Sequence, residues 1–184
     1  MINLLISAGH SQNTGAKTKQ GTFEGNLCIE RVEYLSKHLK TFSNIHIDFE
    51  YSKLSTLRVL LKWLTKRIKY RYVIELHYDS AINENIQRTS VFIQNRTNSE
   101  RSILALSLCE LTKKHIGYAE AVVKTPRESQ HPKGLGLLNA APNDCRFIYE
   151  CSFITNEQHK LFTNEKFALI MNDWITIIDD TLFT

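Results

Sequence analysis

The sequence lacks several features that mark particular classes of protein. It has four cysteines but no C-x-x-C spacing, which argues against a cysteine-based zinc site. It has no run of roughly eighteen apolar residues, so we expect no membrane span. The formal charge of +4 is small and dispersed, and no aromatic ladder interleaves the basic stretch at residues 62–71. We therefore expect no nucleic-acid partner.

Signs of several domains are scarce as well. Only three prolines occur, all between Pro126 and Pro142, and we find no repeat, low-complexity tract or linker. A length of 184 residues suits a single domain, which we expect to span residues 1–184. The opening "MINLLISAGHSQ" lacks a basic leader, and its apolar run stops at Gly9. It predicts a first buried strand, and we expect no signal peptide.

Hydrophobic periodicity divides the chain into alternating strands and helices. The continuous apolar run at residues 2–8 and the strict alternation at residues 45–51 are typical of strands. Further strands are expected at residues 72–77, 89–94, 120–124, 134–138 and 146–153. Helical spacing indicates helices at residues 24–39 and 55–68, at 98–116 and from a capping Asn164 onward. This order predicts an α/β fold: a single twisted, mostly parallel (mixed) sheet of about six strands with helices on both faces.

Side chains that can bind a metal or transfer a proton lie at the ends of these strands. His10 follows the first strand, His77 ends the central strand "YVIELH", and Glu150 lies in the late strand "RFIYECSF". Glu24 opens the first helix, where the helix dipole favours an anion. Sites in α/β sheets form beyond the carboxyl ends of the strands, so we expect these groups to converge.

Two histidines and one glutamate form a zinc ligand set that leaves a fourth position open. A second glutamate that is not on the metal could carry a proton, so the residue types suffice to hydrolyse an amide bond. Other interpretations stay open. A histidine at a strand end is more often a structural, hydrogen-bonded residue, and Glu75 is a rival ligand that lies deeper in its strand. Glu150 is harder to dismiss, because an unpaired carboxylate is costly to bury.

Four segments resemble the motifs of one family, in the same order along the chain: "ISAGHSQNTGA", "GTFEGNLCIERVEYLSKHL", "VIELHYDSA" and "FIYECSFITNEQ". The family is the zinc-dependent N-acetylmuramoyl-L-alanine amidases of type 3, whose twisted sheet is flanked by helices. The resemblance implies that His10, Glu24 and His77 hold one zinc ion and that Glu150 is the general base and acid. The chain departs from the family around the second histidine, where Leu76 precedes and Tyr78 and Asp79 follow.

The family reaction cleaves the amide between N-acetylmuramic acid and the L-alanine of peptidoglycan. The resemblance spans nearly the whole chain, so we expect no separate cell-wall-binding domain. A catalytic domain with neither a wall-binding domain nor an export signal is typical of a phage endolysin. We therefore expect a monomer that is made in the host cytoplasm and lyses the cell wall after release. Two alternatives remain. One is a zinc peptidase or N-acyl amino acid deacylase acting on another amide, and the other is a non-catalytic wall-binding domain of the same fold.

Overall fold

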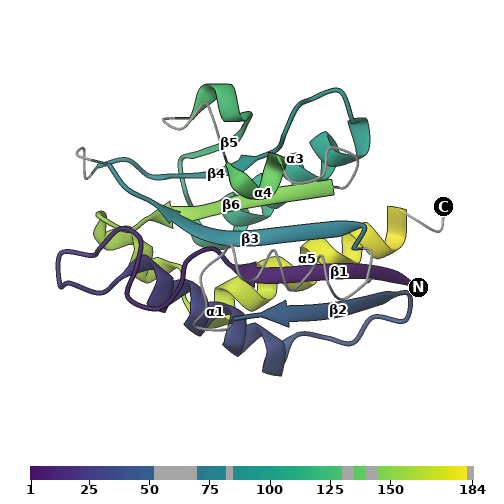
Figure 1. Cartoon of the computed structure of the whole chain (residues 1–184), viewed down its shortest axis with the longest axis horizontal. Coiled ribbons are helices and arrows are strands. Elements are labelled where there is room, and N and C mark those ends of the chain that lie inside the picture. The colour runs from purple at the N-terminus through teal and green to yellow at the C-terminus, as the bar shows by residue number, and fades with distance from the viewer. Residues whose placement is uncertain (52–69, 82–84, 130–134, 140–144, 182–184) are drawn as a thin grey trace.

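The computed structural model describes residues 1–51, 70–81, 85–129, 135–139 and 145–181 (Figure 1). Their strands form one six-stranded sheet in the order β2-β1-β3-β6-β4-β5. The strands are β1 (Ile2–Ala8), β2 (Ile45–Glu50), β3 (Tyr72–Asp79), β4 (Arg88–Phe92), β5 (Glu120–Lys124) and β6 (Cys145–Phe153). Neighbouring strands run parallel except β4 and β6, which are antiparallel. The predicted mixed, mostly parallel sheet is therefore confirmed.

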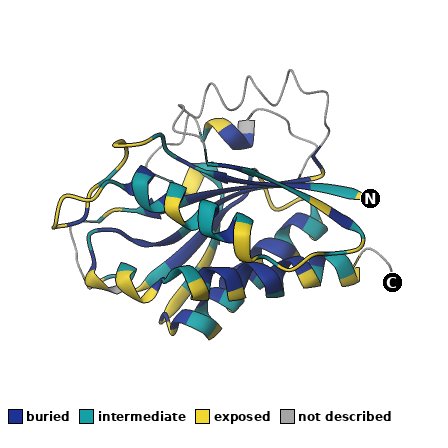
Figure 2. Ribbon diagram, turned by 90° about the horizontal axis from the view of Figure 1, so that it is seen from below, coloured by how far each residue is buried: buried dark blue, intermediate teal, exposed yellow. Residues whose placement is uncertain are grey.

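Long helices cover one face of this sheet (Figure 2). They are α1 (Glu24–His38), α3 (Ser99–Ile116) and α5 (Asn164–Thr181), and the short helix α4 (Gly136–Asn139) packs on the opposite face. Two 3-10 turns, η1 (Pro126–Glu128) and η2 (Glu157–Leu161), complete the described elements. The helix predicted at residues 55–68 lies outside the described residues. None of the described helices has both the length and the apolar composition needed to cross a bilayer.

Strand periodicity separates the two faces of the sheet. In β3, Tyr72, Ile74 and Leu76 belong to the core under the long helices, whereas Val73 belongs to the smaller cluster around α4. Because side chains alternate along a strand, Glu75 and His77 share the face of Val73. The face with fewer described helices is thus the one that carries the polar groups of β3.

Both ends of α3 lie where the sequence predicts them. Asn98 precedes α3, and its side-chain oxygen accepts a hydrogen bond from the N–H of Arg101 at 2.9 Å. Gly117 ends the same helix with φ of +86°, a left-handed conformation that glycine adopts without steric cost.

Two local predictions are wrong. Within residues 134–138 we expected a strand, but Gly136–Asn139 forms α4, whose consecutive residues Leu137 and Leu138 are both buried. A short apolar run does not distinguish a strand from a helical turn, and here packing against the sheet decides. Asn164 is not the cap of the last helix but its first residue. Thr163 precedes it, and the side chain of Asn164 instead contacts Arg31, with Oδ1 2.6 Å from a guanidinium nitrogen.

We predict that Thr112→Val destabilises the protein by about 1–3 kcal/mol. The hydroxyl of Thr112 lies 2.6 Å from the hydroxyl of Tyr149, and both residues are fully buried between α3 and β6. Valine has the same shape but leaves the tyrosine hydroxyl without this partner. Urea unfolding measures the loss, with the exposed Thr176→Val as the control. A change no larger than that of the control would show that this hydrogen bond contributes no net stability.

Candidate metal centre

Three chain segments meet at the carboxyl ends of β1 and β3, on the left of Figure 1. The two strands pair in parallel with Ala8 opposite Leu76, so the residues that follow them reach the same edge of the sheet. His10 lies two residues beyond β1, and His77 lies near the end of β3. Glu24 is the first residue of α1. Topology alone therefore brings the three predicted ligands to one place.

Their potential ligand atoms all lie within 4.8 Å of one another. Nε2 of His10 is 3.3 Å from Oε1 of Glu24, and Nδ1 of His77 is 3.2 Å from the same oxygen. Atoms that bind one tetrahedral zinc ion at about 2.0–2.2 Å are separated from each other by roughly 3.4 Å. Both the donor types and their spacing therefore fit a single zinc ion.

Glu24 is the centre of this arrangement, and it is only 4% exposed. Its Oε1 accepts a hydrogen bond from the N–H of Tyr78 at 3.0 Å, and its Oε2 accepts one from the N–H of Ala16 at 3.1 Å. Burial alone would raise the pKa of Glu24, but hydrogen bonds and charge interactions with His10 and His77 outweigh it and lower the pKa well below the ordinary value. The carboxylate is therefore held ionised and fixed in position.

The start of α1 is stabilised by the preceding loop rather than by a capping side chain. Phe23, the N-cap residue, makes no side-chain cap hydrogen bond. Instead, the carbonyl of Ala16 accepts from the N–H of Glu24 at 2.8 Å, and that of Thr14 accepts from Gly25 at 3.0 Å. The loop that carries His10 is thereby tied to the helix that carries Glu24.

Glycines fit these segments together, and sequence reasoning missed them. A Cβ atom on Gly9 would lie 2.1 Å from Nε2 of His77, and one on Gly25 would lie 2.1 Å from the carbonyl oxygen of Ser11. Gly15 has φ of +84°, and a Cβ there would lie 2.6 Å from Oε2 of Glu24. Sequence position gave only a partial signal: Gly9 and Gly25 are adjacent to His10 and Glu24, but Gly21 also lies near Glu24 and a Cβ there would meet nothing within 4 Å.

The rival ligand Glu75 lies on the other side of the His77 ring. Its Oε2 is 3.2 Å from Nε2 of His77, whereas Glu24 faces Nδ1. Burial lowers the pKa of His77, but the two flanking carboxylates outweigh this and raise the pKa well above the ordinary value. Glu75 therefore contacts one of the candidate ligands and is not among the three residues whose potential ligand atoms cluster.

Glu150 stands beside His77 on the neighbouring strand. The two residues are direct partners in the parallel β3–β6 register. Glu150 is partly exposed, but its Oε2 is buried and has no hydrogen-bond partner among the described residues. Burial raises the pKa of Glu150 to about 8, and the negative charges of Asp79 and Glu24 contribute to the rise while His77 opposes it. A carboxyl group with this pKa can both hold and release a proton near neutral pH.

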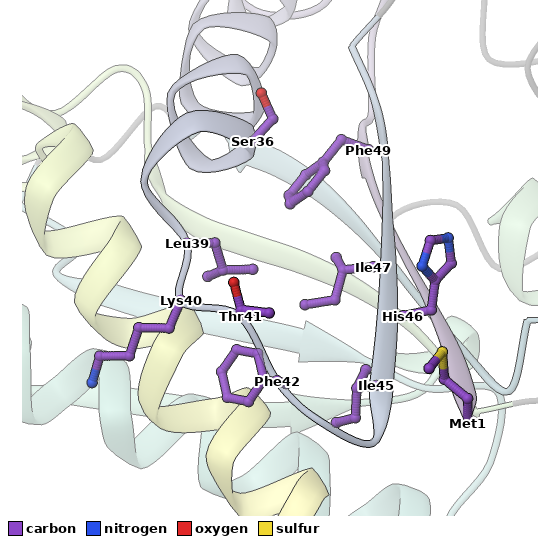
Figure 3. Close-up of a pocket in the computed structure, with 10 residues that line it drawn as sticks. All are labelled: Met1, Ser36, Leu39, Lys40, Thr41, Phe42, Ile45, His46, Ile47 and Phe49. Carbon is purple, nitrogen blue, oxygen red and sulfur yellow. The ribbon is translucent and has the colours of Figure 1, made fainter.

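A separate hollow of about 300 Å³ lies beside the edge strand β2 (Figure 3). Its walls come from the end of α1, the loop after it and β2, and apolar side chains such as Leu39, Phe42 and Phe49 line it. None of the candidate ligands lines it. The candidate ligands and Glu150 thus lie apart from this hollow.

Solved structures of similar fold include two amidases. An N-acetylmuramoyl-L-alanine amidase from Clostridium difficile 630 superimposes with a TM-score of 0.76 at 16% identity, covering 97% of both chains. The catalytic domain of CwlV, an N-acetylmuramoyl-L-alanine amidase from Bacillus (Paenibacillus) polymyxa, also gives 0.76 at 15% identity, covering 98% of this chain and 99% of that one. These similarities establish the shared fold.

Sequence comparison leads to the same family. A Buchnera aphidicola protein named for N-acetylmuramoyl-L-alanine amidase activity is 33% identical over 106 residues. That match covers 55% of this chain and 44% of the relative, less than half of the relative's length. The sequence model of the type 3 N-acetylmuramoyl-L-alanine amidase family matches residues 4–175. Because this match spans nearly the whole chain, the protein belongs to the N-acetylmuramoyl-L-alanine amidase family.

Proposed function

We propose that this protein is a zinc-dependent hydrolase that cleaves the amide between N-acetylmuramic acid and L-alanine in peptidoglycan. The observation that carries the proposal is the position of Oε1 of Glu24, which lies 3.3 Å from Nε2 of His10 and 3.2 Å from Nδ1 of His77, in a chain of the amidase family. Lysis of a host cell wall during phage release is the biological role that we propose for this reaction.

The residues of the cluster suit zinc in type as well as in spacing. Neutral imidazoles and one carboxylate are ligands that zinc commonly takes in hydrolases, with a further position left for water or substrate. His10, Glu24 and His77 would hold the ion. When bound there, zinc supplies a Lewis acid that activates water and polarises the amide carbonyl.

Glu150 is the group that we assign to proton transfer. Its place beside His77 in the sheet puts a carboxyl group next to the ligands without making it a member of the cluster. The partnerless Oε2 is free to accept a proton from the attacking water and to deliver it to the L-alanine nitrogen as that amine leaves. The pKa of about 8 means that this carboxyl group can carry a proton at neutral pH.

Metal binding is tested by single substitution of the ligands. We predict one zinc ion per wild-type chain and none in His10→Ala or His77→Ala. Substituting a residue that supports a metal ligand lowers activity by roughly 10–100-fold, and loss of a ligand itself should lower amidase activity by more than that. Elemental analysis measures the zinc, and chelation followed by zinc addition should abolish and restore activity. His46→Ala, an exposed histidine on β2, is the control. Full activity after complete zinc removal would contradict zinc dependence.

The reaction and the role of Glu150 are tested on purified cell walls. Glu150→Gln should lower kcat by about 10²–10⁴-fold while retaining one zinc ion, because general acid–base catalysis contributes that much. Mass spectrometry of the wild-type digest should show new free L-alanine amines and intact glycan chains. New amines on another residue would identify a stem-peptidase instead, and unchanged catalysis by the variant would remove Glu150 from the mechanism.

The same wall digest bears on the lytic role. Wild-type protein should reduce the turbidity of cells whose outer barriers have been permeabilised, and Glu150→Gln should not. Glu128→Gln changes a glutamate in the exposed η1 turn and serves as the control. Amine release without any fall in turbidity would support the amidase and contradict lysis.

The raised pKa of Glu150 also predicts a pH dependence of stability in the metal-free protein. Between pH 4.5 and about pH 8, the carboxyl group of Glu150 is ionised in the unfolded protein but keeps its proton in the folded protein. The folded state therefore binds more protons than the unfolded state in this range. Stability contributed at this site is therefore present at low pH and lost as pH rises, by at most about 1.4 kcal/mol per pH unit.

Glu150→Gln removes that dependence, because glutamine does not titrate. Urea unfolding in the presence of a chelator should show the variant gaining stability relative to wild type from pH 5 to pH 8. A difference between the two proteins that stays constant across this range would contradict the raised pKa.

A further inference from the structure

The ring of the proposed ligand His77 is constrained on several sides. Its Nδ1 lies 3.2 Å from Oε1 of Glu24, and its Nε2 lies 3.2 Å from Oε2 of Glu75. The ring edge formed by Nε2, Cε1 and Cδ2 lies so close to Gly9 that any Cβ at that position would collide with it. Two carboxylates and the backbone of Gly9 therefore define where this imidazole can lie.

Glu75 is placed for this contact by the strand itself. Residues 75 and 77 of β3 point to the same face, because side chains alternate along a strand. The carboxylate is buried, with its side chain only 5% exposed. Its lateral neighbours in the sheet, Ser7 and Ile148, carry no positive charge. Burying a carboxylate without a charged or hydrogen-bonded partner is costly, so the contact with His77 accounts for its position.

The contact with Glu75 distinguishes the two ring nitrogens of His77. A neutral imidazole carries one N–H group and one lone pair. When Nε2–H donates to Glu75, the lone pair remains on Nδ1, which is the atom that faces Glu24 and lies with His10 in the cluster of ligand atoms. A carboxylate acceptor on the far nitrogen also makes the imidazole a stronger ligand.

We infer that Glu75 is a positioning residue for the metal centre: it holds His77 with Nδ1 directed at the ion and increases the affinity of the site for zinc. The inference rests on the proposed function, since it assumes that His10, Glu24 and His77 bind zinc. It gives Glu75 a role different from that of a fourth ligand, because Glu75 contacts the nitrogen that points away from Glu24.

Zinc affinity and histidine NMR test this role. Glu75→Ala should raise the zinc Kd, measured by chelator competition, by about 10–100-fold. Glu75→Gln keeps an oxygen that can accept the hydrogen bond and should raise it less. In ¹⁵N spectra of the zinc-loaded wild type, His77 should carry its proton on Nε2. In Glu75→Ala the Nε2 proton should exchange faster with water than in the wild type and in Glu100→Gln.

Glu100→Gln is the matched control. Glu100 accepts a hydrogen bond from the hydroxyl of Tyr72 at 2.5 Å, at the opposite end of the same strand. Its substitution also removes a carboxylate that contacts β3, but it should leave the zinc Kd and the His77 spectrum unchanged. If Glu75→Ala does not fold, Glu75→Gln still gives both measurements against this control.

The outcomes separate this inference from the proposed function. Wild-type zinc affinity and an unchanged His77 spectrum in both Glu75 variants would overturn the positioning role while leaving the amidase proposal intact. A proton on Nδ1 of His77 in the zinc-loaded wild type would overturn it as well. Failure of the wild type to bind zinc would overturn both the positioning role and the proposed function. Zinc binding that depends on Glu75, without any cleavage of the cell wall, would support the positioning role and overturn the proposed reaction.

Discussion

The buried carboxylate of Glu24 is the interaction on which the rest of the site depends. It accepts hydrogen bonds from the N–H groups of Ala16 and Tyr78 and lies within 3.3 Å of a ring nitrogen of both His10 and His77. One side chain thus joins the loop after β1, the start of α1 and the end of β3. A charge this deeply buried is tolerated only because all of these donors surround it. Any change that moves one of the three segments therefore removes some of the contacts that offset the cost of burying this carboxylate.

Because side chains alternate along each strand, the sheet packs apolar residues on one face and carries the polar residues of the candidate site on the other. One face of β3 contributes Tyr72, Ile74 and Leu76 to the core beneath the long helices. The other face carries Glu75 and His77, and Glu150 lies beside His77 on β6. Shifting the β3–β6 register by one residue would exchange these faces and bury the polar groups in the core. The packing of apolar residues on one face thus fixes which polar side chains lie together on the other.

Sequence reasoning predicted that His10, Glu24 and His77 converge, and in the structure their potential ligand atoms lie together. Strand ends and a helix start converge in an α/β sheet, so His10, Glu24 and His77 could be predicted without coordinates. The position of Glu75 could not, since alternation places residues 75 and 77 on one face but does not say which ring nitrogen the carboxylate meets. The need for glycine at Gly9 also escaped prediction. Its reason is the distance to a ring 68 positions further along the chain, which only folding reveals.

Charge explains why these groups would attract a cation. Glu24, Glu75 and Glu150 bring three carboxyl groups to the surroundings of His77, and His10 adds a second imidazole. In the metal-free chain the charge of Glu24 helps to raise the pKa of Glu150, which therefore keeps its proton near neutral pH. A divalent cation between the ligands would offset the charge of Glu24 and favour the ionised form of Glu150, the form that can accept a proton. The same electrostatics that would draw a metal to the site would thus prepare its neighbouring carboxylate to act as a base.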